Sequence, residues 1–81
     1  MIEKKIKKVM ATVFNVNITD IVENTSPDTL KNWNSLGHMN LVLALEEEFK
    51  VSFKDEQIVE MNNYSLLVCI IKECLVEGVA Q

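Results

Sequence analysis

Residues 33–49 have the sequence WNSLGHMNLVLALEEEF, in which a serine, Ser35, comes directly before a periodic apolar run. A Ser or Asn side chain at a helix start can accept a hydrogen bond from a free first-turn amide. We therefore predict a helix from about Ser35 to Phe49. A step of about 100° per residue gives this helix a core side. That side consists of Leu41, Val42, Leu45 and Phe49, with His38 nearby.

The chain before this helix contains one further helical pattern and a long connection. Residues 2–15 carry apolar side chains at helical spacing opposite lysines, which predicts a first helix. Residues 16–34 are rich in Asn, Asp and Ser and indicate a loop that is partly pinned by apolar anchors. A loop of this length is uncommon in a small domain and is often functional. The expected anchors are Ile18, Ile21, Val22 and Leu30.

Two more helices are predicted after the helix that starts at Ser35. Residues 50–53 form a short connector, and residues 55–60 form a short third helix. Asn62 and Asn63 interrupt the third helix and can cap a fourth over residues 64–77. Helical spacing predicts the inward-facing residues of these two helices to be Ile58, Met61, Tyr64, Leu67, Val68, Ile71 and Leu75.

Length and composition set the fold class. A chain of 81 residues makes one domain and buries only about 60% of the surface that it exposes when unfolded, so a deep enzyme cleft is not expected. Two glycines, one proline and 48% hydrophobic residues favour compact regular structure over disorder. We predict a single all-α domain over residues 1–81. It is a small four-helix bundle with a long loop between the first two helices and a short third helix, and we expect a monomer.

Charge limits the classes of partner. The net charge is −4, and acidic residues dominate after residue 8, because residues 1–8 contain four lysines and one glutamate. An acidic surface repels nucleic acid and anionic lipid and attracts basic proteins. The N-terminal lysines have no interleaved aromatic residues, so we interpret them as a solvated helix face. Neither nucleic acid nor a membrane is expected as a partner.

Localisation and metal binding follow from short-range patterns. The apolar run after the first lysines is too short for a signal peptide. No run approaches the roughly 18 apolar residues of a membrane span. Cys69 and Cys74 match neither a redox pair nor a zinc-ligand spacing, which fits a reducing compartment. We expect a cytoplasmic protein without a metal site.

The side of helix 35–49 that is turned away from the core carries apolar residues. Several exposed apolar side chains beside carboxylates are typical of a docking surface, on which the carboxylates steer basic partners. The alternative is that the preceding loop covers them. The residues on this side and its flank are Leu36, Met39, Asn40, Leu43, Glu46 and Glu47.

Ser35 and the only histidine, His38, raise the alternative of a serine hydrolase. Such chemistry requires a histidine that a third group orients and donors that are aimed at an oxyanion. The sequence identifies neither, so no catalytic residue is assigned and the chain is not expected to be an enzyme. A helix start instead suits an anionic attachment, because its free amides and dipole favour negative charge. We interpret Ser35 as an attachment point, His38 as packed or bonded to a loop, and Trp33 as an anchor of the loop.

The sequence NSLGHMNLVLALEEEF of residues 34–49, the four-helix pattern and the chain length together resemble an acyl carrier protein. The resemblance covers essentially the whole chain. It implies that Ser35 receives 4'-phosphopantetheine from coenzyme A through a phosphopantetheinyl transferase, the holo-carrier synthase. The thiol of this arm then carries acyl groups as thioesters to acyl-transferring or acyl-processing enzymes, as in fatty acid biosynthesis and lipid metabolism.

The same resemblance implies roles for residues near Ser35. In this family the second helix is the main surface that the transferase and the partner enzymes read, and acyl chains are held between the helices. The implied docking residues are Asn34, Leu36, Met39, Asn40, Leu43, Glu46 and Glu47. The implied lining of the acyl pocket is Leu45, Ile58, Met61 and Leu67.

This chain departs from the family in two ways. Asn34 stands where the family usually has Asp, which keeps the hydrogen-bonding shape but removes a charge that a basic transferase could pair with. Gly37, His38 and Asn40 make the helix start less acidic than in typical fatty-acid carriers, which favours a specialised carrier in a dedicated pathway. The alternatives are an aminoacyl or peptidyl carrier and an unmodified helical interaction module. The sequence does not specify the cargo.

Overall fold

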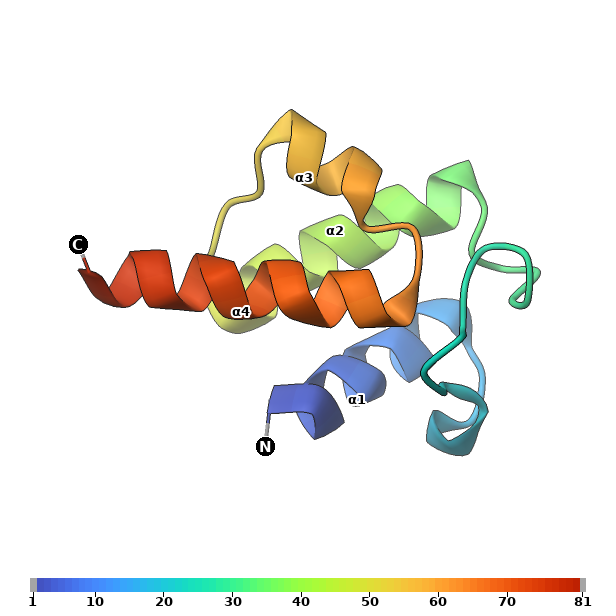
Figure 1. Cartoon of the computed structure of the whole chain (residues 1–81). Coiled ribbons are helices and arrows are strands. Elements are labelled where there is room, and N and C mark those ends of the chain that lie inside the picture. Colours follow the sequence, from blue (N-terminus) through green and yellow to red (C-terminus); the bar gives the residue numbers. More distant parts are fainter. Residues whose placement is uncertain (1, 81) are drawn as a thin grey trace.

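The computed structural model describes residues 2–80, and of residues 77–80 only the helical backbone. Within this range the chain is all-helical, which confirms the predicted fold class (Figure 1). The elements are α1 (Ile2–Phe14), the 3-10 turn η1 (Ile18–Asp20), α2 (Ser35–Phe49), α3 (Asp55–Glu60) and α4 (Tyr64–Ala80). The loop between α1 and α2 lies at one end of the bundle, and both chain ends lie at the other (Figure 1).

The helix ends follow from local residues. α1 stops because Asn15 takes the left-handed conformation, with φ 57°. Asn34 caps α2, since its Oδ1 accepts a hydrogen bond from the Gly37 N–H at 2.8 Å. Asn63 caps α4 in the same way, accepting from the Leu66 N–H at 2.8 Å. α4 continues to Ala80 instead of ending at residue 77, because a single glycine weakens a helix without terminating it.

Every helix except α3 contributes fully buried residues to one hydrophobic core. On α2 these are Leu41, Val42 and Leu45, as predicted, whereas Phe49 is half-buried. On α4 the buried face is wider than predicted, because Ile70 is buried in addition to Ile71. The predicted inward residue Leu75 is only half-buried.

One predicted loop anchor is wrong. Ile21 is buried, but Val22 is 48% exposed. Ile21 has extended backbone angles, and successive side chains of an extended segment point to opposite sides. Burial of Ile21 therefore turns its neighbour outward.

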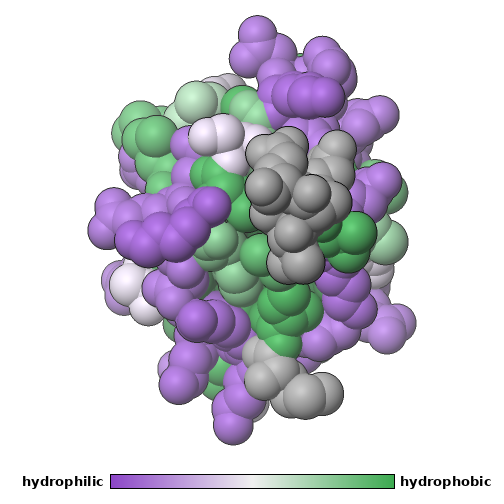
Figure 2. Space-filling model, turned by 90° about the vertical axis from the view of Figure 1, so that its left-hand side faces the viewer, coloured by the Kyte–Doolittle hydropathy of each residue, from purple (hydrophilic) through white to green (hydrophobic). Residues whose placement is uncertain are grey.

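The end of the molecule with the two chain termini has a mixed surface. Hydrophilic residues lie around the rim of this face, and hydrophobic residues show between them near its centre (Figure 2). Among the residues that the structure describes, no helix has both the length and the apolar character that crossing a membrane requires. Cys69 is exposed and Cys74 is buried, as expected for the outer side and the core margin of α4.

Candidate functional site

Ser35 is the first residue of α2 and is exposed. Its neighbour Asn34 is also exposed, and the carboxamide oxygen of Asn34 is held by the Gly37 N–H. In the first turn of a helix the N–H groups of Ser35 and Leu36 have no partner within the helix. The hydroxyl of Ser35 therefore lies at the surface, at the positive end of the helix dipole.

The loop before Ser35 is fixed to α1 and to the first turn of α2 by Asn32. The side-chain Nδ2 of Asn32 donates to the Phe14 carbonyl at 2.7 Å, which satisfies a C-terminal carbonyl of α1. The backbone oxygen of Asn32 lies against Gly37, where any Cβ would overlap it. Gly37 is thus required by close packing of the loop on the helix. The sequence showed only that this position is less acidic than usual.

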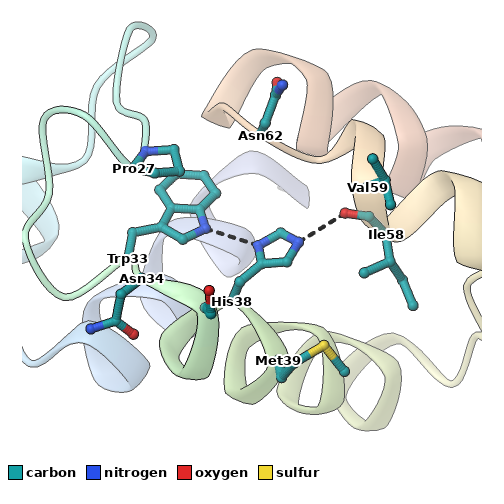
Figure 3. A pocket seen from close by; sticks show the side chains of 9 residues that line it. Pro27, Trp33, Asn34, His38, Met39, Ile58, Val59 and Asn62 are labelled. Carbon is teal, nitrogen blue, oxygen red and sulfur yellow. Dashed lines mark hydrogen bonds between the residues drawn. The ribbon is translucent and has the colours of Figure 1, made fainter.

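Trp33 and His38 lock the same loop to α3. Trp33 is 1% exposed, and its ring stacks on Phe14 with centroids 5.4 Å apart. Its Nε1–H donates to His38 Nδ1 at 2.9 Å, and His38 Nε2 lies 2.8 Å from the Ile58 carbonyl oxygen (Figure 3). Because an indole N–H can only donate, Nδ1 is the acceptor and Nε2 carries the proton that Ile58 accepts.

This arrangement settles the sequence interpretations of both aromatic residues. Trp33 anchors the loop against the helices, and His38 is packed and bonded, which confirms both interpretations. The two ring nitrogens of His38 are engaged by Trp33 and Ile58. Neither nitrogen is placed to take a proton from Ser35, so the structure gives no support to a serine hydrolase.

An open groove of about 590 Å³ lies beside Ser35, between the loop, α2 and α3 (Figure 3). Most of its lining is apolar, with amide and imidazole groups at intervals. Pro27, Val59 and Asn62 belong to it although the sequence analysis did not assign them to the site. The lining residues are Pro27, Trp33, Asn34, Ser35, His38, Met39, Ile58, Val59 and Asn62.

The four residues that the resemblance assigns to an acyl pocket do not lie together on this groove. Ile58 lines it. Leu45, Met61 and Leu67 are 0% exposed and belong to the hydrophobic core. The groove and the predicted pocket thus share only Ile58, which also packs against the core.

The expected docking residues lie on the outer surface of α2, apart from one. Leu36, Met39 and Leu43 are 72%, 46% and 60% exposed, so the loop does not cover them. Asn40 and Glu47 are also exposed. Glu46 differs, because it is half-buried and its Oε2 accepts a hydrogen bond from the Phe53 N–H at 2.9 Å.

Charged groups elsewhere form exposed ion pairs. Lys72 pairs with Glu3 at 2.8 Å, and Lys5 pairs with Glu48 at 3.2 Å. The Lys72 ammonium lowers the pKa of the Glu3 carboxyl below its ordinary value, chiefly through their hydrogen bond. Across the described part of the chain, no three His, Cys, Asp or Glu side chains gather as a metal site.

Comparison with known proteins agrees with this geometry, although no protein-family model matches the sequence. An acyl carrier protein of Buchnera aphidicola subsp. Schizaphis graminum is 34% identical over 61 residues, which cover 75% of this chain and 77% of that protein. The solution NMR structure of holo acyl carrier protein from Geobacter metallireducens has the same fold. Its TM-score is 0.87 at 23% identity, over 98% of this chain and 91% of that one. The sequence relationship and the shared fold show that this chain belongs to the acyl carrier protein family.

Proposed function

We propose that this protein is an acyl carrier in which the Ser35 hydroxyl bears 4'-phosphopantetheine, and that it serves a specialised biosynthetic pathway. The observation that carries the proposal is the position of Ser35. It is exposed, it is the first residue of α2, and it lies on the edge of an apolar groove. An attached group can therefore extend either into solvent or along the groove.

The residues around Ser35 fit a phosphodiester. The first-turn N–H groups of Ser35 and Leu36 point out of the helix start, and the helix dipole there favours an anion. Asn34 already occupies the Gly37 N–H, which leaves the other two amides for the phosphate. When bound, the group supplies a thiol that forms thioesters with acyl groups. The chain itself contributes the hydroxyl, the anion-binding amides and the groove.

The outer side of α2 is the surface that we assign to the transferase and to acyl-processing enzymes. Leu36, Met39 and Leu43 supply apolar contact area, and the exposed Glu47 attracts basic partners. Glu46 is less accessible to a partner, because it is half-buried and one of its carboxylate oxygens accepts a hydrogen bond from the Phe53 N–H. Its role is to hold the α2–α3 connector in place.

The specialised pathway is suggested by the chemistry of the helix start. Asn34 is neutral, Gly37 has no side chain, and the imidazole of His38 is bonded inward to Trp33 and Ile58. A basic enzyme thus finds no carboxylate in the first turn of α2. Partners of this carrier are selected by the apolar residues and by charges further along the helix.

A modification assay tests this function. The protein is incubated with coenzyme A and a broad-specificity phosphopantetheinyl transferase, and the intact mass is recorded over time. We expect a gain of one phosphopantetheine, absent in Ser35→Ala. Asn34→Asp is the matched variant for charge, since Asp also caps the helix, and we expect it to be modified faster. No mass gain with any transferase favours the unmodified interaction module.

A further inference from the structure

The groove beside Ser35 and the hydrophobic core share a wall. Trp33 and Ile58 both line the groove and pack in the core. His38 joins them, because it accepts a hydrogen bond from Trp33 and donates one to Ile58 (Figure 3). We call these three residues the Trp33–His38–Ile58 bridge. It connects the loop, the first turns of α2 and the end of α3.

The core in which Trp33 and Ile58 pack is closed. Leu45, Met61 and Leu67 are 0% exposed. A hydrocarbon chain that enters the core between Trp33 and Ile58 must separate His38 from its partners. Separation leaves the indole N–H and the Ile58 carbonyl without partners in apolar surroundings, which is unfavourable. Entry is therefore opposed by two specific hydrogen bonds in addition to the packing of the core.

The length of the acyl chain determines whether its burial can offset the loss of the two hydrogen bonds. Each methylene that moves from water into an apolar interior favours the buried state by about fourfold. A short acyl group gains too little from burial to offset two lost hydrogen bonds, so it stays in the groove. A long chain that stays in the groove keeps much of its apolar surface in water.

We propose that the Trp33–His38–Ile58 bridge is a specificity-determining element that keeps cargo in the open groove and suits this carrier to short acyl groups. The proposal rests on the proposed function, because the cargo reaches the groove from Ser35. His38 is a positioning residue in this account. It acts by holding Trp33 to Ile58 and not by touching the thioester.

The test compares acetyl, butanoyl and octanoyl groups on the holo protein. Loading is verified first by intact mass, and two readouts follow: the reactivity of the thioester toward hydroxylamine and the NMR methyl signals of the core. In the unmodified sequence we expect similar reactivity for all three groups. We expect octanoyl to shift the Met39 and Val59 signals but not those of Leu45, Met61 and Leu67.

Two substitutions at His38 separate hydrogen bonding from packing. His38→Gln supplies both an acceptor and a donor, and it is expected to behave as His38 does. His38→Leu fills space without forming hydrogen bonds, so we expect octanoyl to enter the core in this variant. The reactivity of the octanoyl thioester should then fall by up to about fourfold per buried methylene. The reactivity of the acetyl thioester should not change. Trp33→Phe, which keeps an aromatic ring but removes the indole donor and part of the ring volume, gives the same result if His38→Leu does not fold. Core methyl shifts with octanoyl in the unmodified sequence, or equal behaviour of the Gln and Leu variants, overturn the proposal.

Failure of the proposed function can be distinguished from failure of this inference. If no transferase loads Ser35, the carrier function fails at the mass measurement. The bridge is then tested in a Ser35→Cys, Cys69→Ser protein that carries an ethyl or octyl group as a mixed disulfide, with the same methyl signals. Entry of octyl only when the His38→Leu change is added supports the bridge, and entry without that change contradicts it.

Discussion

The two ends of α2 are built in different ways. At the end that presents Ser35, contacts depend on particular residues: Asn34 caps the helix, Gly37 admits the Asn32 carbonyl, and His38 bonds to two partners. These contacts join residues within the segment 32–38 to one another and to Ile58 of α3. They fix the direction in which the first turn of α2 faces the groove.

At the other end, α2 stops by general helix chemistry. Lys50 takes the left-handed conformation, with φ 56°, and its N–H bonds to the Glu46 carbonyl. Glu48 makes an exposed ion pair with Lys5, of a kind that contributes little to stability. From this difference we expect the end that carries the serine to be more sensitive to single substitutions than the opposite end, where Glu46 holds the connector through the Phe53 N–H.

The largest contrast is expected between two aromatic residues. Trp33→Ala removes a fully buried ring and its hydrogen bond to His38, and should lower the free energy of unfolding by about 3–5 kcal/mol. Phe49→Ala, at the other end of α2, removes a half-buried ring and should cost clearly less. Urea unfolding followed by circular dichroism measures both. Equal losses would contradict the comparison.

Gly37→Ala should also destabilise the protein, despite the higher helix propensity of Ala. The propensity gain is about 1 kcal/mol. The new Cβ overlaps the backbone oxygen of Asn32, and such overpacking costs roughly 1–3 kcal/mol, with no flexible side chain to yield. Glu47→Ala, an exposed change on the same helix, should stay within about 0.5 kcal/mol. A more stable Gly37→Ala protein would show that the loop can move away from α2.

Substitutions at the two caps of α2 are expected to change the stability of the protein in opposite directions. Asn34→Ala loses the hydrogen bond to the Gly37 N–H and should cost about 1 kcal/mol. Lys50 has the left-handed conformation, which is unfavourable by about 1 kcal/mol for a residue with a Cβ. Glycine adopts this conformation without that cost, so Lys50→Gly should stabilise the protein. The melting temperature should fall in the first variant and rise in the second. A shift of both in one direction would contradict this assignment of the caps.

The smallest effect is expected from the Glu3–Lys72 pair, which links α1 to α4 at the surface. The pKa of Glu3 is lowered in the folded protein, so its contribution is present above the unfolded pKa and is lost as pH falls through the folded value. Glu3→Gln should therefore be slightly less stable than the unmodified sequence near neutral pH. The two should converge in acid. Unfolding curves over this pH range provide the check, and a difference that grows in acid would reverse the sign.

The sequence was sufficient to predict the features that depend on helical periodicity and on local capping chemistry. The start of α2 follows from the capping chemistry of Asn and Ser, and its buried Leu41 and Leu45 and exposed Leu36 and Leu43 follow from a step of about 100° per residue. Trp33, which comes just before the serine, was predicted to anchor the loop, and its burial confirms this. These features need no knowledge of how distant segments meet.

The features that the sequence did not reveal depend on the path of the loop and on the orientation of α3. The contact of Gly37 with Asn32 and the bond of His38 to Ile58 join residues through backbone atoms, which no side-chain pattern encodes. Glu46 falls on the outer flank of a helical wheel, yet the connector returns and places the Phe53 N–H on its carboxylate. The backbone path of the connector decides that contact.

The most direct measurement of the central claim is the mass of one tryptic peptide. Cleavage after Lys31 and Lys50 releases residues 32–50, in which Ser35 is the only hydroxyl-bearing residue and no cysteine is present. After treatment with coenzyme A and a transferase, we predict that this peptide alone gains one phosphopantetheine. A gain on another peptide, or an unchanged mass for residues 32–50 under conditions that modify another acyl carrier protein fully, would contradict the role of Ser35.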